Sequence, residues 1–303
     1  MLTHSLRCLL THLLTHSFPP LLTHSLALTR SLTPRSTGGM GEEWGKQLAA
    51  EGFNLILQGR NESKLSLVKS AILARNPSTD VRLLVCEATI WPNEALTSGL
   101  TALLSSPDVR LHMVINNLGT VGAGFPRFED ESSEAISSVI ISNSIFPAEI
   151  SRIAMPYLKR YQPSFLGVVT SLGAWSCTPY VSPYIGTKGF DVAFSRALYN
   201  EMALEGEEVD VCCIAPGQVQ SGMHTGPTGI MVPSSKEWTE EAIKGLRPTW
   251  WNPRPPPVFV PWKWHRWALN VTLYLPEWVR DTICRRMAPQ LRAQYWAEKA
   301  KNE

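Results

Sequence analysis

The chain has 303 residues, enough for two domains or for one large domain with a full hydrophobic core. Hydrophobic residues make up 44% and charged residues 18%, which excludes a disordered or fibrous protein and predicts a globular one. The formal net charge of +2 is far from the strongly basic character of nucleic-acid binders, so no nucleic-acid partner is expected. No apolar run reaches the roughly 18–20 residues needed to span a bilayer.

The N-terminal segment, residues 1–36, is built from a short repeat. Leu-Thr-His-Ser begins at residues 2, 14 and 22, and no acidic residue precedes Glu42. This pattern predicts a low-complexity segment; it resembles a transit peptide weakly, and a translated simple-sequence tract or a wrong gene start is the alternative. Its histidines follow the repeat and not a coordination geometry, so no metal site is predicted. The six cysteines form no C-x-x-C, which favours a reducing compartment.

From residue 42 onward, helix-type and strand-type segments alternate. Helices are predicted at 42–51, 62–75, 94–104, 133–160 and 183–205. Strands are predicted at 53–58, 81–86, 111–115, 165–170 and 209–214. These strands are continuous apolar runs, typical of parallel strands buried on both faces. The order predicts an α/β protein with a doubly wound, mostly parallel sheet of the Rossmann type.

Beyond Pro216 the alternation of helix-type and strand-type segments stops. Residues 248–265 are rich in Pro and Trp, and a basic, helix-compatible stretch follows at 278–301. We therefore divide the chain into the low-complexity segment 1–36, a Rossmann-type domain at 37–223, and a Trp-rich C-terminal segment at 224–303.

The strongest chemical signal is Tyr184-Ile185-Gly186-Thr187-Lys188, which follows Ser171 by thirteen residues. A Tyr and a Lys four residues apart lie on the same side of a helix. An ammonium held near a phenol favours the phenolate, as donation of a proton to a carbonyl requires. Ser171 ends a predicted strand and can hydrogen-bond the same substrate oxygen.

Two further motifs occur in a fixed order around this one. Asn116-Asn117-Leu118-Gly119 ends the strand predicted at 111–115, and Pro216-Gly217-Gln218-Val219-Gln220-Ser221 follows the last predicted strand. Together with Ser171, Tyr184 and Lys188 they resemble the short-chain dehydrogenase/reductase family over about residues 37–223.

The resemblance implies a role for each of these positions. Asn143, Ser171, Tyr184 and Lys188 would be catalytic, with Tyr184 as the acid, Lys188 also binding the ribose of the cofactor, and Asn143 holding a water that links Lys188 to solvent. Asn116 and Gly119 would brace the central strands and contact the adenosine side. The segment with Pro216, Gly217, Val219 and Ser221 would pass the nicotinamide carboxamide.

The glycine loop of the cofactor site agrees only in part. Such loops let the backbone approach a pyrophosphate at a helix N-terminus. Gly39, Met40 and Gly41 match the last part of the family's T-G-x-x-x-G-x-G, but Pro34 and Arg35 stand where Thr and Gly belong. The polar residues 29–33 replace an apolar first strand and are expected to pair poorly. We therefore expect a degenerate or missing first strand and a lost original start, which sequencing the 5′ end of the transcript tests.

The residues that follow the strand at 53–58 indicate which nucleotide the protein prefers. An acidic residue there would accept the ribose 2′-OH of NAD, whereas Arg60, followed by Asn61, can pair the 2′-phosphate of NADP. NADP(H) is therefore predicted. Glu87 follows the next strand, where the family usually places an Asp beside the adenine.

Residues 52–65 are similar to the branch that contains very-long-chain 3-oxoacyl-CoA reductases and 17-beta-hydroxysteroid dehydrogenases. The resemblance implies a hydrophobic substrate and a location at the surface of the endoplasmic reticulum membrane, with the cytoplasm as the alternative. The tail at 224–303 resembles the substrate lid and C-terminus of that branch. Its Trp and basic residues suit packing against the edge of the sheet or a lid, peripheral contact with anionic lipid, or both. A homodimer is also compatible with the family.

The leading hypothesis is NADPH-dependent reduction of a ketone on a lipid-like substrate, either a 3-oxoacyl-CoA or a keto-steroid. A general or secondary-metabolism carbonyl reductase shares all of these motifs and stays open. So does a pseudoenzyme or truncated product with impaired cofactor binding, because Pro34 and Arg35 interrupt the glycine loop.

Overall fold

The computed structural model describes residues 26–30, 39–122, 124–222, 224, 226–247 and 254–301. Within these ranges, seven strands form one sheet in the order β3-β2-β1-β4-β5-β6-β7, and every neighbouring pair is parallel. The strands are β1 (Leu26–Arg30), β2 (Asn54–Gly59), β3 (Val81–Val85), β4 (Leu111–Asn116), β5 (Ser164–Val169), β6 (Val209–Ile214) and β7 (Val258–Phe259). This is the doubly wound sheet that the sequence predicts.

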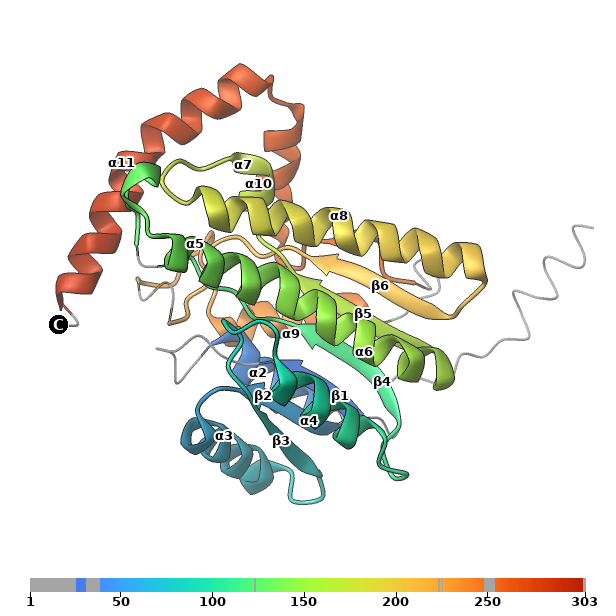
Figure 1. Ribbon diagram of the computed structural model, residues 1–303. Helices are drawn as coiled ribbons and strands as arrows, with labels where there is room; N and C mark the ends of the chain where they lie inside the picture. Colours follow the sequence, from blue (N-terminus) through green and yellow to red (C-terminus); the bar gives the residue numbers. More distant parts are fainter. Residues whose placement is uncertain are drawn as a thin grey trace, which may run out of the picture.

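Helices cover both faces of the sheet (Figure 1). They are α2 (Met40–Ala50), α3 (Glu62–Arg75), α4 (Glu94–Leu104), α5 (Ser133–Ile140), α6 (Phe146–Arg160), α7 (Gly173–Ser176), α8 (Ser182–Glu205), α9 (Ser235–Leu246), α10 (Lys263–Tyr274) and α11 (Glu277–Lys301). Short turns occur at Phe128–Asp130 and Ile141–Ile145. The predicted ranges 62–75, 94–104 and 209–214 coincide with α3, α4 and β6, and most others differ by one or two residues at their ends.

The helix predicted at 133–160 is interrupted. A π-helical turn, Ile141–Ile145, separates α5 from α6 and has Asn143 at its centre. Such turns insert one extra residue and are frequent at functional sites. Apolar periodicity continues through the turn, so the sequence pattern does not reveal it.

The first strand departs from expectation. β1 lies at the centre of the sheet and pairs with both β2 and β4, so the expectation of poor pairing is wrong for residues 29 and 30. The strand begins at Leu26, before the residues 29–33 that were expected to replace it. The backbones of β2 and β4 supply hydrogen-bond partners along both of its edges. Its register against β4 shifts between Leu26 and Ala27, so it is irregular. Residues 31–33, Pro34, Arg35 and the histidines His4, His12, His16 and His24 lie outside the described residues.

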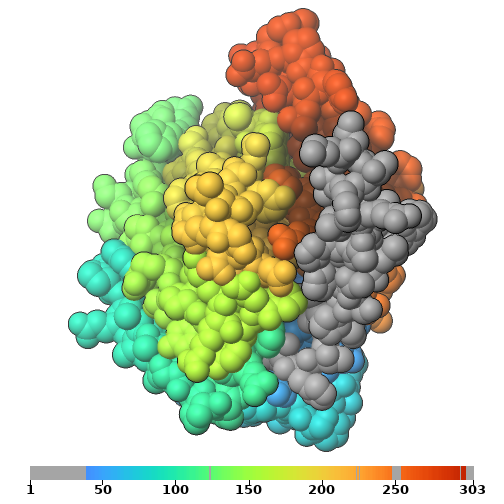
Figure 2. All heavy atoms as spheres, turned by 90° about the vertical axis from the view of Figure 1, so that its right-hand side faces the viewer, coloured from blue at the N-terminus to red at the C-terminus, as the bar shows by residue number. Residues whose placement is uncertain are grey.

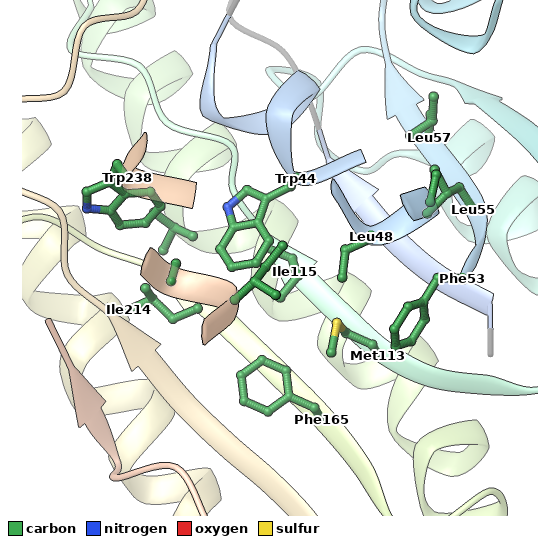
Figure 3. Packing of buried hydrophobic residues seen from close by; sticks show 14 of the residues in the cluster. Trp44, Leu48, Phe53, Leu55, Leu57, Met113, Ile115, Phe165, Ile214 and Trp238 are labelled. Atoms are coloured by element: carbon green, nitrogen blue, oxygen red, sulfur yellow. The ribbon is translucent and has the colours of Figure 1, made fainter. Parts of the chain in front are cut away.

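Two apolar clusters hold the helices to the sheet. One lies under α4, α6 and α8, and the other under α2, α3 and α9. In the second cluster, Trp44 of α2 and Trp238 of α9 meet edge to face at 6.2 Å above Ile115 of β4 and Ile214 of β6 (Figure 3). Both indoles are fully buried, so α9 closes this face of the sheet although it lies outside the alternating part of the sequence.

The chain beyond residue 224 adds to the sheet and to the cavity described below. β7 pairs with β6, but two residues between prolines carry no periodicity that could predict a strand. α9 begins with a capping box in which Ser234 and Glu237 hydrogen-bond each other's backbone. α10 and α11 form an arm that projects from the top of the molecule (Figures 1 and 2).

Candidate active site

A cavity of about 770 Å³ lies at the carboxyl ends of the central strands. Residues that follow β1, β4, β5 and β6 all line it, as expected where the strand order of an open α/β sheet reverses. Of the predicted site residues it brings together Gly39, Met40, Gly41, Gly119, Ser171, Tyr184, Lys188, Pro216, Gly217, Val219 and Ser221.

Ser171 and Tyr184 reach the cavity from separate elements. Ser171 lies two residues beyond Val169, the last residue of β5. Its hydroxyl accepts a hydrogen bond from the Gly173 N–H at 3.1 Å. Tyr184 lies in the first turn of α8 and is half-buried. A serine hydroxyl and a phenol on one wall can both address a substrate carbonyl oxygen.

Lys188 lies one turn along α8 and is buried. Its Nζ lies 5.9 Å from the centre of the Tyr184 ring and donates to the carbonyl of Val169 at 2.9 Å and to Asp191 Oδ2 at 2.8 Å. Burial lowers the pKa of Lys188, but the negative charge of Asp191 and its hydrogen bond to the ammonium raise it, so the net pKa is raised. The lysine is therefore an ammonium at the wall of the cavity. Asp191 was missed in the sequence analysis, although its spacing from Lys188 puts both on one helix face.

Asn143 lies behind the cavity wall. Its amide donates to the Thr120 carbonyl at 2.9 Å and to Thr187 Oγ1 at 3.0 Å, and its Oδ1 accepts from the Thr120 N–H at 2.9 Å. These bonds tie the π-helical turn to the loop after β4 and to α8. The predicted role of Asn143 in a water relay stays a prediction.

At its other end the cavity meets the start of α2. Gly39 precedes this helix without a side-chain cap, so the first backbone N–H groups face no capping side chain. Asn117 Oδ1 is buried in the wall and has no hydrogen-bond partner among the described residues. An uncapped helix N-terminus and an unpartnered acceptor fit a dinucleotide, whose pyrophosphate and ribose hydroxyls would satisfy them.

Arg60, Asn61 and Glu87 are not part of the cavity wall. Arg60 Nη1 donates to Glu87 Oε2 at 3.1 Å, and Asn61 caps α3 by accepting from the Lys64 N–H. Burial raises the pKa of Glu87, but hydrogen bonds from Arg60 and Thr89 outweigh it and leave the pKa below its ordinary value. Arg60, predicted to bind the 2′-phosphate, is thus paired with Glu87, predicted to lie beside the adenine.

Asn116 acts as a structural brace. Its buried amide donates to Ser151 Oγ at 3.0 Å and to the Pro147 carbonyl at 3.3 Å, which joins β4 to α6. Asn117, and not Asn116, lines the cavity. Asn117 belongs to the motif Asn116 to Gly119, but the sequence alone did not distinguish it as a site residue.

His265 of α10 was also missed. It is buried, its Nδ1 accepts from the Gly217 N–H at 3.0 Å, and its Nε2 lies 3.0 Å from the Met231 carbonyl. Burial lowers its pKa, so the ring is neutral, with Nε2–H as the donor. A lone histidine in a Trp-rich segment gives no sequence signal for such a contact.

The C-terminal arm also lines the cavity. Apolar and polar side chains of α10 and α11 contribute Ala268, Leu269, Thr272, Leu291 and Tyr295. Tyr295 also packs against Phe125 at 5.2 Å. The C-terminal region is thus helical and contributes to the cavity that the predicted catalytic residues line, and its role as a lid stays a prediction.

Comparison with known proteins agrees with this architecture. The family model of short chain dehydrogenases matches residues 36–228, and the chain belongs to the short-chain dehydrogenase family of oxidoreductases. It is 27% identical over 209 residues to a very-long-chain 3-oxoacyl-CoA reductase of Pyricularia oryzae, covering 69% of this chain and 62% of that protein. A reductase of the same name from Podospora anserina is 25% identical, with 84% of this chain and 71% of the relative covered.

A solved structure, described as giving insights into 7beta-hydroxysteroid dehydrogenase stereoselectivity, superposes with a TM-score of 0.71 at 17% identity. It covers 87% of this chain and 96% of that chain, and so supports the fold. None of the described helices is both long enough and apolar enough to cross a membrane.

Proposed function

We propose that the protein reduces a ketone on a long-chain acyl substrate, of the 3-oxoacyl-CoA class, to a secondary alcohol with NADPH. The observation that carries this proposal is the composition of the cavity wall, which includes Ser171, Tyr184 and Lys188 together with apolar side chains such as Leu269 and Leu291. A polar end would hold the carbonyl while the apolar wall accommodates a chain. The names of the curated relatives support the acyl-CoA class.

The geometry of the cavity and membership of the family support the following roles. Ser171 orients the carbonyl oxygen, and Tyr184 donates the proton that this oxygen gains. The charged Lys188 favours release of that proton and offers an N–H to the ribose. NADPH, when bound, supplies the hydride that the carbonyl carbon gains. Gly39, Gly41 and Asn117 would hold its pyrophosphate and ribose, and Gly217 with Val219 would flank the carboxamide.

Tyr184→Phe tests the proposal. The ring is retained and only the hydroxyl is lost, so the fold should persist while NADPH-dependent ketone reduction falls by about 10²–10⁴-fold, the usual contribution of a general acid. Reduction is followed by NADPH absorbance, and folding by thermal unfolding. Retention of activity by this variant would refute the assignment of Tyr184.

The substrate class is tested by comparing rates for a long 3-oxoacyl-CoA, a keto-steroid and a small ketone with the same preparation. A preference for the acyl-CoA supports the proposal. Comparable rates for all three would instead identify a general carbonyl reductase. Failure to bind NADPH at millimolar concentration would identify a pseudoenzyme.

The arm formed by α10 and α11 suggests peripheral contact with a membrane, and we propose the endoplasmic reticulum surface as its location. Trp267, Tyr274 and Trp278 are 58%, 91% and 71% exposed, and Arg285 and Arg286 are exposed on the same arm. Exposed aromatic and basic side chains suit an interface with anionic lipid. A homodimer also stays a proposal.

The double variant Tyr274→Ser and Trp278→Ser is expected to weaken binding to phosphatidylserine-containing vesicles by about tenfold, measured by flotation, because two interfacial anchors are lost. Leu204→Ser is the matched control, since Leu204 is 88% exposed but lies at the end of α8. Equal binding by all three proteins would contradict contact through the arm.

A further inference from the structure

Asp191 is a buried acid next to the predicted active site, and the proposed reaction gives it no role. Its side chain is 2% exposed, and that of Lys188 is 3% exposed. Asp191 does not line the cavity, whereas Lys188 does. The carboxylate therefore lies behind the lysine, out of reach of a bound substrate or cofactor, and any effect on the reaction passes through Lys188.

The contacts of Lys188 restrict what its ammonium can do. Of the three N–H donors of an ammonium, one is directed to the Val169 carbonyl and one to Asp191 Oδ2. One donor then remains for the cavity. The side chain is also held close to the loop after β4, since a Cβ on Gly119 would lie 3.6 Å from Nζ.

The Lys188 ammonium is removed from water and therefore needs a negative charge nearby to remain protonated. Burial alone favours the neutral amine, and buried lysines without a partner commonly lose their proton near neutral pH. The titratable groups that face Lys188 are Tyr184 and Asp191 on α8 and Cys213 on β6. Burial raises the pKa of Cys213 to about 12, so this residue remains a neutral thiol. Asp191 is thus the carboxylate that compensates the lysine.

We infer that Asp191 is a positioning residue whose carboxylate keeps the Lys188 ammonium charged and anchored, with one N–H left for the cavity. This inference rests on the proposed function for its catalytic consequence, but the ion pair itself can be tested without substrate or cofactor.

Asp191→Asn keeps the shape and a hydrogen-bond acceptor but removes the charge. In this variant Lys188 should lose its proton within the working range of pH, whereas in the unchanged protein it stays charged. The ratio of unchanged to variant kcat/KM for ketone reduction should therefore increase as pH rises from about 6 to about 9, by up to roughly tenfold per unit above the lowered pKa of Lys188.

Unfolding of the cofactor-free protein gives the independent readout. A lysine that is neutral when folded but protonated when unfolded makes the unfolded state bind more protons, so stability rises with pH. The stability of Asp191→Asn relative to the unchanged protein should therefore improve from about pH 6 to about pH 9, while its relative activity declines. Opposite pH trends of activity and stability are a signature that mere loss of packing does not produce.

Four further variants complete the experiment. Asp191→Glu should retain the pH profile because it retains the carboxylate, and Glu201→Gln, an exposed acid on α8, should change neither readout. Lys188→Met should be strongly destabilised by the carboxylate it leaves buried, and adding Asp191→Asn should restore much of that stability.

A pH-independent loss of activity with no pH trend in relative stability would overturn the inference, as would a Lys188→Met protein that gains nothing from Asp191→Asn. If the unchanged protein reduces none of the tested ketones, the proposed function fails, and the unfolding series alone then decides the role of Asp191.

Discussion

At the scale of single residues, the Arg60–Glu87 pair offers the most direct test of the proposed preference for NADPH. Both side chains are partly exposed, at 42% and 29%, so the pair contributes only about 0–1 kcal/mol and can be exchanged for a stronger partner. A 2′-phosphate would be such a partner for Arg60, since charge-assisted bonds from a guanidinium to a phosphate are strong. Glu87 competes for the guanidinium and places a negative charge nearby.

Glu87→Gln should therefore tighten NADPH binding by about two- to fivefold and leave NADH binding unchanged, because only NADPH carries the 2′-phosphate. Fluorescence titration with both nucleotides measures the effect. Glu94→Gln, an exposed acid at the start of α4, is the control. Equal tightening for both nucleotides would argue against a role of Arg60 in selectivity.

At the scale of elements, α10 holds the loop that follows β6. His265 links this loop, through Gly217, to the turn at residues 229–232, and Trp262 donates from Nε1 to the Ile230 carbonyl at 2.7 Å. A Cβ at Gly217 would lie 2.7 Å from the imidazole, so glycine is required for this close approach. The lid and the predicted carboxamide loop are thus mechanically connected.

Gly217→Ala should displace the His265 ring and break its bond from the Gly217 N–H. The expected cost is about 1–3 kcal/mol in the free energy of unfolding, as for overpacking elsewhere, together with weaker NADPH binding. Denaturant unfolding and nucleotide titration measure the two effects. Gly229→Ala is the control because a Cβ there meets nothing within 4 Å. Identical behaviour of the two variants would show that the close contact at Gly217 has no energetic importance.

At the scale of the whole molecule, stability should depend on pH through Asp210 of β6. Burial raises the pKa of Asp210 to about 6, even though Arg254 lies 3.8 Å away. The folded state therefore binds a proton more tightly than the unfolded state does. The resulting stabilisation is complete below about pH 4 and is lost as pH rises through about 6.

Asp210→Asn should accordingly stabilise the protein by about 1–2 kcal/mol at pH 7, after allowance for partial solvent screening, and have little effect near pH 4. Chemical unfolding at the two pH values measures this. Glu240→Gln, on the outer surface of α9, should change stability at neither pH. A variant that is equally stabilised at both pH values would rule out titration of Asp210 as the cause.

The sequence by itself predicted the parallel sheet, because local apolar runs reveal buried strands, and its motifs carried the resemblance to the family that the family model shows. It also singled out Ser171, Tyr184 and Lys188 as candidates, and the structure brings these three residues to one cavity. The sequence placed α3, α4 and β6 at their observed bounds from the same kind of local pattern. The motifs Asn116 to Gly119 and Pro216 to Ser221 likewise lie directly after strands, where local pattern is informative.

Only the tertiary structure decided what each of these residues contacts. The pairing of Lys188 with Asp191, the pairing of Arg60 with Glu87 and the contact of His265 with Gly217 depend on which elements pack together. The same holds for β1, whose backbone is placed by strands on either side, and for β7, which is too short to show a period. Local sequence predicts the elements and the residue types, whereas burial and long-range contacts determine their charges and partners.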